Sequence, residues 1–219
     1  MNKKIVKLIK KYKELKKAEC NVFLVVFKFI CYYLFFGKRK ILARQGTIFR
    51  KISNIEMREG SRLEIGTIYR GTCDKHKRTL INIKGKMIIN GIVNIAPGVV
   101  IDICKGGVFE LGNEVSINFD SLIVCKKHIV FGDGTNVGWG CHFFDGCFHE
   151  DSFMGGKSAD SPIIIGKNVH LFEKVAVCRG VKIADDCKVQ AHSVIDRSFS
   201  VPNSTILTKR EFLVVSDKR

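Results

Sequence analysis

The chain of 219 residues lacks the features that mark several common classes of protein. Its nine cysteines include no Cys-x-x-Cys pair, so a structural zinc site has no support. They are scattered and no export signal precedes them, which favours free thiols in a reducing cytoplasm over a disulfide framework. Acidic residues are scarce, because 21 Asp and Glu stand against 37 Lys and Arg. No nucleic-acid-binding motif accompanies the resulting charge of +16, so nucleic acid is not the expected partner.

An apolar run near the N-terminus is too short for an ordinary membrane span. Residues 22–36 are apolar except for Lys28, whereas a spanning helix needs roughly twenty apolar residues. No small-residue cleavage site follows, which argues against a signal peptide. Residues 1–17 contain eight Lys and one Glu, and residues 38–40 are again basic. Three interpretations stay open: a helix in the membrane interface with its lysines on anionic lipid, a helix that caps the rest of the fold, and a true span or signal anchor.

A spacing of six residues runs through the last quarter of the chain. The aliphatic residues in this series are Ile165, Leu171, Val177, Ile183, Val189, Ile195, Val201 and Leu207. A helix repeats its buried face every 3.6 residues and a strand every two, so a strict six predicts short strands in a chain that keeps turning. These residues are expected to point inward. Upstream stretches such as Ile89, Ile95 and Ile101 keep the spacing but change phase, and each change predicts a loop or an irregular corner.

The six-residue units resemble the hexapeptide repeats of the left-handed β-helix acyltransferases. Examples are Ile-Gly-Lys-Asn-Val-His from Ile165 and Ile-Ala-Asp-Asp-Cys-Lys from Ile183. The resemblance implies an all-β solenoid, a left-handed parallel β-helix in which three units form one triangular turn. We expect a basic and apolar helical segment at residues 1–45, membrane-peripheral or capping. The β-helix domain is expected at residues 46–219, interrupted by a loop insertion.

The insertion is expected between Phe143 and Ile165, where the register of six breaks and Gly, Ser and Asp accumulate. Asp145 and His149 stand at its start. A histidine can take a proton from an alcohol, and a nearby carboxylate can hold its tautomer. Residues 138–149 resemble the segment of bacterial polysaccharide and lipopolysaccharide O-acetyltransferases in which a Gly-Trp turn leads to Asp-x-Asp-x-His. The resemblance implies that His149 is the catalytic base and Asp145 the first aspartate, while Cys147 replaces the second.

The same resemblance implies further site residues. Asn118 and Trp139 are candidate substrate contacts, although an asparagine also suits a solenoid corner because it tolerates left-handed backbone angles. Ala191 is expected to offer its backbone to the pantetheine arm of coenzyme A. Three cationic side chains are candidates for binding the phosphates of coenzyme A: Arg197, Lys209 and Arg210. Lys209 and Arg210 can equally be solvated charges near a terminus.

The expected function is transfer of an acetyl group from acetyl-CoA, as co-substrate and without a required metal, to a sugar or glycan hydroxyl in surface-glycan biosynthesis. The resemblance implies a homotrimer with sites between chains. We expect a cytoplasmic protein that contacts the inner face of the cell membrane if residues 1–40 bind lipid. The alternatives are a scaffold that has lost its chemistry, an acyl-enzyme through Cys147, and a zinc enzyme like the γ-type carbonic anhydrases. The histidines available for zinc are His128, His142, His149, His170 and His192.

Overall fold

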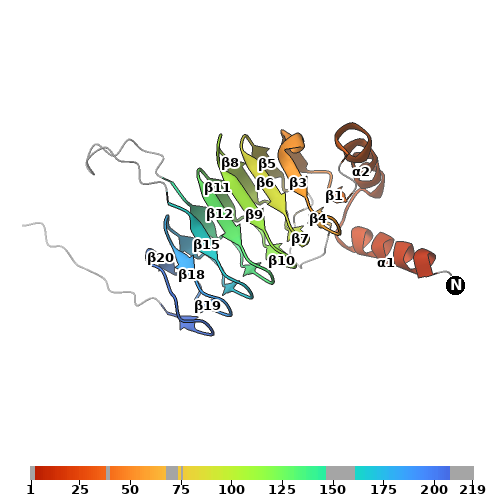
Figure 1. Cartoon of the computed structure of the whole chain (residues 1–219). Helices are drawn as coiled ribbons and strands as arrows, with labels where there is room; N and C mark the ends of the chain where they lie inside the picture. The colour runs from red at the N-terminus through yellow and green to blue at the C-terminus, as the bar shows by residue number, and fades with distance from the viewer. Residues whose placement is uncertain (1–2, 38–39, 68–73, 75, 147–160, 208–219) are drawn as a thin grey trace, which may run out of the picture.

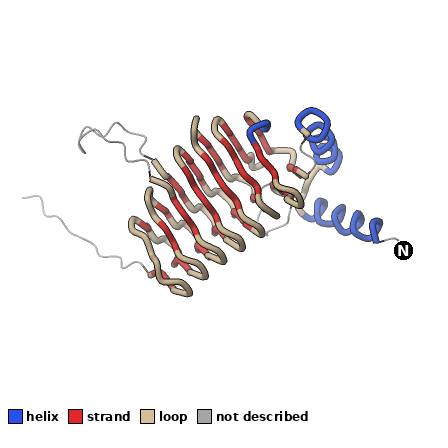
Figure 2. The backbone as a smooth tube through the Cα atoms, viewed as in Figure 1, coloured by secondary structure: helices blue, strands red, loops and turns tan. Residues whose placement is uncertain are grey.

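The strands form a coil with three flat sides. The computed structural model describes residues 3–37, 40–67, 74, 76–146 and 161–207. Within them, every paired strand is parallel to its neighbours, and successive strands pass from one sheet to the next around the coil (Figures 1 and 2). The hexapeptide-repeat architecture, a left-handed parallel β-helix preceded by helices, is therefore confirmed.

Each sheet takes one strand from each turn of the coil. Sheet A contains β1 (Ile41–Ala43), β4 (Arg62–Ile65), β7 (Ile92–Ile95), β10 (Val115–Ile117), β13 (Asn136–Val137), β16 (His170–Leu171), β19 (Lys188–Val189) and β21 (Thr205–Ile206). Sheet B contains β2 (Thr47–Arg50), β5 (Thr79–Ile83), β8 (Val100–Ile103), β11 (Leu122–Cys125), β14 (His142–Phe144), β17 (Ala176–Val177) and β20 (Val194–Ile195). Sheet C contains β3 (Ile55–Met57), β6 (Lys86–Ile89), β9 (Val108–Leu111), β12 (His128–Phe131), β15 (Ile163–Ile165) and β18 (Lys182–Ile183). A short 3-10 helix, Ile52–Asn54, lies between β2 and β3.

The changes of phase in the sequence come from turns of different length. Leu171 pairs with Val189, eighteen residues later, as regular hexapeptide units require. Further upstream Ile95 pairs with Ile117 after twenty-two residues. The strands of sheets B and C are four residues long there, as in β8 and β9, but two residues long in β17 and β18. Longer strands place two inward residues on each side, so the upstream coils are wider.

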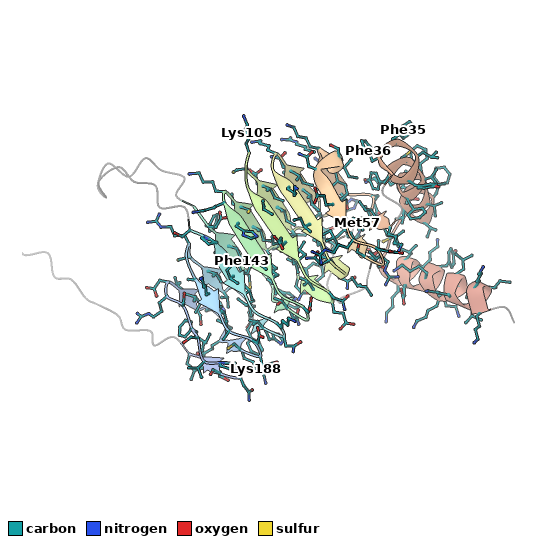
Figure 3. All side chains as sticks on the ribbon, viewed as in Figure 1. Phe35, Phe36, Met57, Lys105, Phe143 and Lys188 are labelled. Carbon is teal, nitrogen blue, oxygen red and sulfur yellow. The ribbon has the colours of Figure 1, made fainter. Side chains whose placement is uncertain are left out.

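The core is a stack of aliphatic residues that becomes aromatic beside the insertion. Phe131 lies with its ring centroid 5.1 Å from that of Phe109 and 4.8 Å from that of Phe143. All three side chains are fully buried, and Figure 3 shows Phe143 within the coil. Rings that fill three successive turns make a rigid support for the residues that follow Phe143.

The expectation that the whole series of six points inward is wrong at its end. Val201 and Leu207 are 66% and 68% exposed, and Ile206 occupies the buried position instead. The backbone explains the change, because Val189 pairs with Ile206 after seventeen residues and not eighteen. Strand register is determined by backbone pairing, so a turn one residue shorter moves the inward position by one.

Helix α2 (Val22–Phe36) covers the N-terminal end of the coil. Asn21 caps its start by accepting the N–H of Leu24 through its side chain, 3.2 Å away, and Gly37 ends it at φ 64°. Its Val25 is fully buried, and the ring of Tyr32 packs edge-on against Phe49 at 5.6 Å. Burial raises the pKa of Tyr32 to about 12.

Lys28 is the single charged residue of α2 and points toward the coil. Its ammonium donates to three backbone carbonyls, at 3.1 Å from Arg44 O, 3.1 Å from Gln45 O and 2.9 Å from Thr47 O. Burial lowers the pKa of Lys28, whereas these carbonyls match the three donors of the charged form. The coil starts at β1, which pairs with β4, so the boundary expected at residue 45 lies inside the first turn.

Replacing Lys28 by methionine is expected to lower the free energy of unfolding by about 2 kcal/mol, since three carbonyls lose their donor. The midpoint of thermal unfolding should fall by about 5 °C for a chain of this size. The matched control is Lys13→Met, at an exposed position of α1. Equal midpoints for the two variants would show that the Lys28 contacts do not stabilise the fold.

Helix α1 (Lys3–Lys17) is attached to the coil through Glu64. The carboxylate of Glu64 is buried and lies 2.5 Å from Lys11 Nζ and 3.0 Å from Arg62 Nε. Neither described helix is by itself long and apolar enough to cross a membrane; the α1–α2 pair passes by length and composition but bends by 117° at its break.

Candidate active site

Asp145 lies at the root of the insertion and is completely buried. Its carboxylate accepts the backbone N–H groups of Lys126 at 2.6 Å, Lys127 at 2.8 Å and His128 at 2.6 Å. The thiol of Cys125 donates to the same carboxylate at 3.6 Å. These donors belong to the preceding turn of the coil, so Asp145 ties two turns together at the corner between sheets B and C.

The same residue closes the insertion. The backbone oxygen of Asp145 accepts the N–H of Ser161 at 2.9 Å, which brings the two ends of the loop together. Burial, followed by the charge of Asp145, raises the pKa of the Cys125 thiol, so this thiol stays protonated and can donate. Asp145 therefore positions the start of the segment that carries His149. A contact between Asp145 and His149 stays a prediction, because His149 lies outside the described residues.

A pocket of about 390 Å³ opens at the corner between sheets A and B. It is lined by Asn118, Gly138, Trp139, His170, Phe172 and Glu173. Strand pairing explains why these residues meet. Ile117 pairs with Val137 and Val137 with Leu171, so the residues that follow them stack on successive turns. The structure thus brings the two predicted substrate contacts, Asn118 and Trp139, into one pocket.

Asn118 is a structural part of this pocket wall. Its amide nitrogen donates to Val137 O at 2.8 Å and to Asn136 Oδ1 at 3.2 Å, on the next turn. These hydrogen bonds fit the interpretation of Asn118 as an asparagine at a solenoid corner. Its position in the pocket wall fits the interpretation of Asn118 as a substrate contact.

The hollow of the pocket depends on Gly138. A Cβ atom at this position would lie 2.6 Å from the carbonyl carbon of Phe172, so no side chain fits between the turns. Trp139 is 54% exposed and rests edge-on against Phe119 at 6.1 Å. The rings of His170 and Phe172 stack at 4.6 Å. The pocket therefore presents aromatic faces beside one carboxylate, that of Glu173.

Sequence reasoning missed His170, Phe172 and Glu173 as pocket residues. They are separated from Gly138 and Trp139 by the insertion, which hides their register. Counting the turns of the coil across the insertion could have found them. The hexapeptide that starts at Ile165 leads into the strand that pairs with residues 136–137, so residues 170–173 stack on residues 136–139.

The predicted cofactor residues divide between two corners. Ala191 follows β19, one turn beyond Glu173, and its neighbour His192 donates its backbone N–H to Glu173 O at 2.9 Å. Ala191 therefore extends the corner that holds the pocket. Arg197 follows β20 at the corner of sheets B and C, the corner of Asp145, and its side chain is exposed beside Asp196. Lys209, Arg210 and Cys147 lie outside the described residues.

Sheet B separates the two corners. At β11 it is four residues wide, or roughly 13 Å. Within one chain the pocket and the root of the insertion are therefore held apart by the rigid width of the coil.

The described part of the chain contains no group of three or more His, Cys, Asp or Glu side chains that could hold a metal ion. Its seven described cysteines form no disulfide: Cys20, Cys31, Cys104, Cys125, Cys141, Cys178 and Cys187. Burial raises the pKa of Cys141 to about 11. One described histidine, His128, pairs with Glu110 at 3.0 Å.

Comparison with known proteins identifies a relative of similar size. No protein-family model matches the chain. The chain is 30% identical over 191 residues to an uncharacterized 24.8 kDa protein in the cps region of Klebsiella pneumoniae, covering 87% of this chain and 85% of the relative. The two proteins belong to one family.

Two solved structures are similar to this chain. One is a hexapeptide-repeat-containing acetyltransferase from Vibrio cholerae O1 biovar eltor complexed with acetyl coenzyme A, with 21% identity and a TM-score of 0.43 over 48% of this chain and 58% of that protein. The other is the polySia-specific acetyltransferase NeuO, with 12% identity and a TM-score of 0.39 over 82% of this chain and 89% of NeuO.

Proposed function

We propose that this protein transfers an acetyl group from acetyl-CoA to a hydroxyl group of a sugar or glycan. The observation that carries the proposal is the pocket at the corner of sheets A and B. Two residues predicted as substrate contacts from the sequence, Asn118 and Trp139, lie in its wall although twenty other residues separate them in the chain.

The chemistry of the pocket suits a sugar. An exposed indole can lie against the C–H face of a sugar ring, while a carboxylate such as that of Glu173 and an imidazole such as that of His170 can bond hydroxyl groups. Phe172 adds a second aromatic wall. The pocket is open and its polar groups are few, which fits one sugar unit of a larger glycan.

In the proposed reaction His149 acts as general base. It takes the proton from the acceptor hydroxyl while the hydroxyl oxygen attacks the carbonyl carbon of the thioester. The bond between that carbon and sulfur then breaks, coenzyme A leaves as its thiol with the proton from His149, and the acetyl group stays on the sugar oxygen. Asp145 contributes by holding the start of the loop that carries the base.

The proposed site is built from two chains of a homotrimer. The width of sheet B keeps the pocket away from the root of the insertion in one chain, and a neighbouring chain can supply the missing corner. The groove between chains would then place the backbone of Ala191 beside the pantetheine arm.

Coenzyme A is expected to raise the melting temperature of the protein, because a ligand that binds only the folded state stabilises it. The gain is about 2.7 kcal/mol at roughly a hundredfold excess over Kd. Ala191→Tyr should remove the shift by filling the groove, while the control Lys182→Tyr, at an exposed position of sheet C, should keep it. If saturating coenzyme A leaves the wild-type melting temperature unchanged, the scaffold alternative is favoured.

The acceptor is to be identified with labelled acetyl-CoA and glycan fractions of the host. The relative in a cps region makes surface glycans the first fraction to test. The label should stay on the glycan after coenzyme A is removed from the sample. Its release by mild base would then identify an acetyl ester on a hydroxyl group.

A further inference from the structure

The outer face of α2 is apolar along its whole length. Phe23 and Phe35 are 77% and 75% exposed. The other large apolar side chains exposed on this helix are Leu24, Val26, Phe27, Ile30, Tyr33, Leu34 and Phe36. Figure 3 shows Phe35 and Phe36 at the periphery of α2, outside the coil. A patch of this kind is uncommon on a protein that stays in water and indicates a surface that another phase or molecule covers.

The direction of Lys28 makes this face continuous. Lys28 is the charged residue that shortens the apolar run in the sequence, and the structure turns it inward onto the carbonyls of Arg44, Gln45 and Thr47. No charge of α2 therefore interrupts the outer face. One side of α2 covers the end of the coil, and the opposite side is the exposed apolar face.

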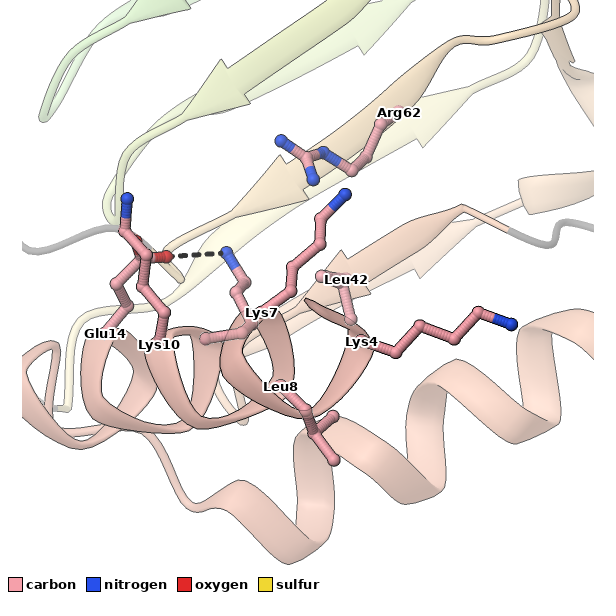
Figure 4. Close-up of a pocket in the computed structure, with 8 residues that line it drawn as sticks. Lys4, Lys7, Leu8, Lys10, Glu14, Leu42 and Arg62 are labelled. Atoms are coloured by element: carbon pink, nitrogen blue, oxygen red, sulfur yellow. Dashed lines mark hydrogen bonds and ion pairs between the residues drawn. The ribbon is translucent and has the colours of Figure 1, made fainter. Parts of the chain in front are cut away.

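Helix α1 adds a basic pocket of about 530 Å³ on its side toward β4. The charged side chains that line it are Lys4, Lys7, Lys10, Lys11 and Arg62, with one acidic residue, Glu14. In Figure 4, Lys7 and Arg62 extend toward each other on one side of α1, and Leu8 points to the opposite side. The pocket presents several cations to one region of solvent, as a phosphate-bearing ligand requires.

An apolar groove of about 470 Å³ lies between α1 and α2, and Leu8, Lys11 and Leu42 line both the groove and the basic pocket. Its walls include Ile9 and Tyr12 of α1 and Phe29 of α2. Cationic and apolar surfaces thus meet along α1. Their order matches a phospholipid, in which a phosphate headgroup lies next to hydrocarbon acyl chains.

We propose that α1 and α2 form a docking surface for a bilayer that contains anionic phospholipids. The aromatic and aliphatic side chains of α2 insert among the acyl chains, and lysines of α1 such as Lys4, Lys7 and Lys10 bind the lipid phosphates. The positive charge of α1 favours an anionic bilayer over a second copy of the chain as the occupant of this surface. Two copies joined through this surface would bring two sets of eight lysines together, and their repulsion opposes association.

The candidate active site stays accessible in the docked protein. The pocket lies on β10, β13 and β16, which follow β1 by three to five places in sheet A, or ~15–25 Å along the coil. Membrane docking and coenzyme A binding can therefore be tested separately.

Sedimentation of the full-length protein with vesicles tests the proposal. The vesicles consist of phosphatidylcholine alone or of phosphatidylcholine mixed with phosphatidylglycerol. The wild type should sediment with the mixed vesicles and far less with the neutral ones. The charge variant Lys4→Gln/Lys7→Gln/Lys10→Gln should weaken partition on the order of a hundredfold, from about fivefold for each lysine. The apolar variant Phe23→Ser/Leu34→Ser/Phe35→Ser should weaken it by about as much or more.

Matched controls lie elsewhere on the coil. Lys105→Gln/Lys182→Gln/Lys188→Gln removes the same charge from exposed positions, and Val194→Ser/Val201→Ser/Leu207→Ser removes exposed apolar side chains from the opposite end. Both should partition like the wild type, and thermal unfolding should confirm that every variant is folded. Absence of sedimentation with either vesicle, equal partition into both, or losses as large in the controls would overturn the proposal. So would an apolar variant that changes only the oligomeric state measured by ultracentrifugation.

Discussion

Replacing His149 by alanine is expected to lower kcat for acetyl transfer by about 10²–10⁴-fold, the usual contribution of a positioned general base. The acceptor hydroxyl is a poor nucleophile while it keeps its proton, so the loss should appear in kcat more than in the KM for acetyl-CoA. The measurement is release of coenzyme A thiol with the acceptor present. Added imidazole should restore part of the rate, because a small base can occupy the space that the substitution leaves.

Two variants make the His149 result specific. His142→Ala removes an exposed histidine from β14 and should leave turnover unchanged. Cys147→Ala tests the acyl-enzyme alternative, which requires a covalent acetyl-thiol intermediate. Complete loss of turnover in the cysteine variant, with activity retained in His149→Ala, would replace the proposed mechanism by the acyl-enzyme.

Replacing Asp145 by asparagine is expected to destabilise the fold by about 2–4 kcal/mol. The carboxylate accepts three backbone N–H groups and a thiol. An amide of the same shape has one acceptor oxygen, and its NH₂ group must face an N–H donor, so at least one buried donor loses its partner. The midpoint of thermal unfolding should fall by about 5–15 °C.

The control for Asp145 lies at the same corner of the coil. Asp196→Asn changes an exposed carboxylate and should leave the midpoint within about 1 °C, as surface substitutions usually do. Activity of Asp145→Asn, measured well below its midpoint, then separates two roles. A folded variant with lowered turnover supports a role of Asp145 in positioning His149, and a folded variant with normal turnover supports a purely structural role. An unchanged midpoint would contradict the bonding network at the root of the insertion.

The coil was predictable because its signal is local and repeated. From Ile165 to Ile195 each sixth residue is buried, and the same turn length recurs. The prediction fails at Val201 and Leu207, where the sequence keeps the spacing but the backbone shortens the turn. Val201, which precedes Pro202, fits the six-residue spacing only because it is aliphatic. The pairing of β19 with β21 buries Ile206 and leaves its neighbour Leu207 exposed.

The candidate site was only partly predictable. Asn118, Trp139 and Asp145 attracted attention as residues of a resembling segment, but Phe172 and Glu173 belong to the pocket only through strand pairing across the insertion. The structure adds a role for Asp145 that the sequence did not indicate. Its carboxylate binds backbone donors of a preceding turn some eighteen residues away, while its predicted contact with His149 stays a prediction.

The amino-acid sequence by itself determined the solenoid, the place of its insertion and the basic, apolar character of the first forty residues, since each depends on residue type and spacing along the chain. The tertiary structure alone decided which groups the side chains of Lys28 and Asp145 bind. Lys28 binds carbonyls of the coil and leaves an apolar face outside, and Asp145 binds backbone donors of another turn. Both outcomes depend on bringing distant backbone groups within hydrogen-bonding distance, which spacing in the sequence does not encode.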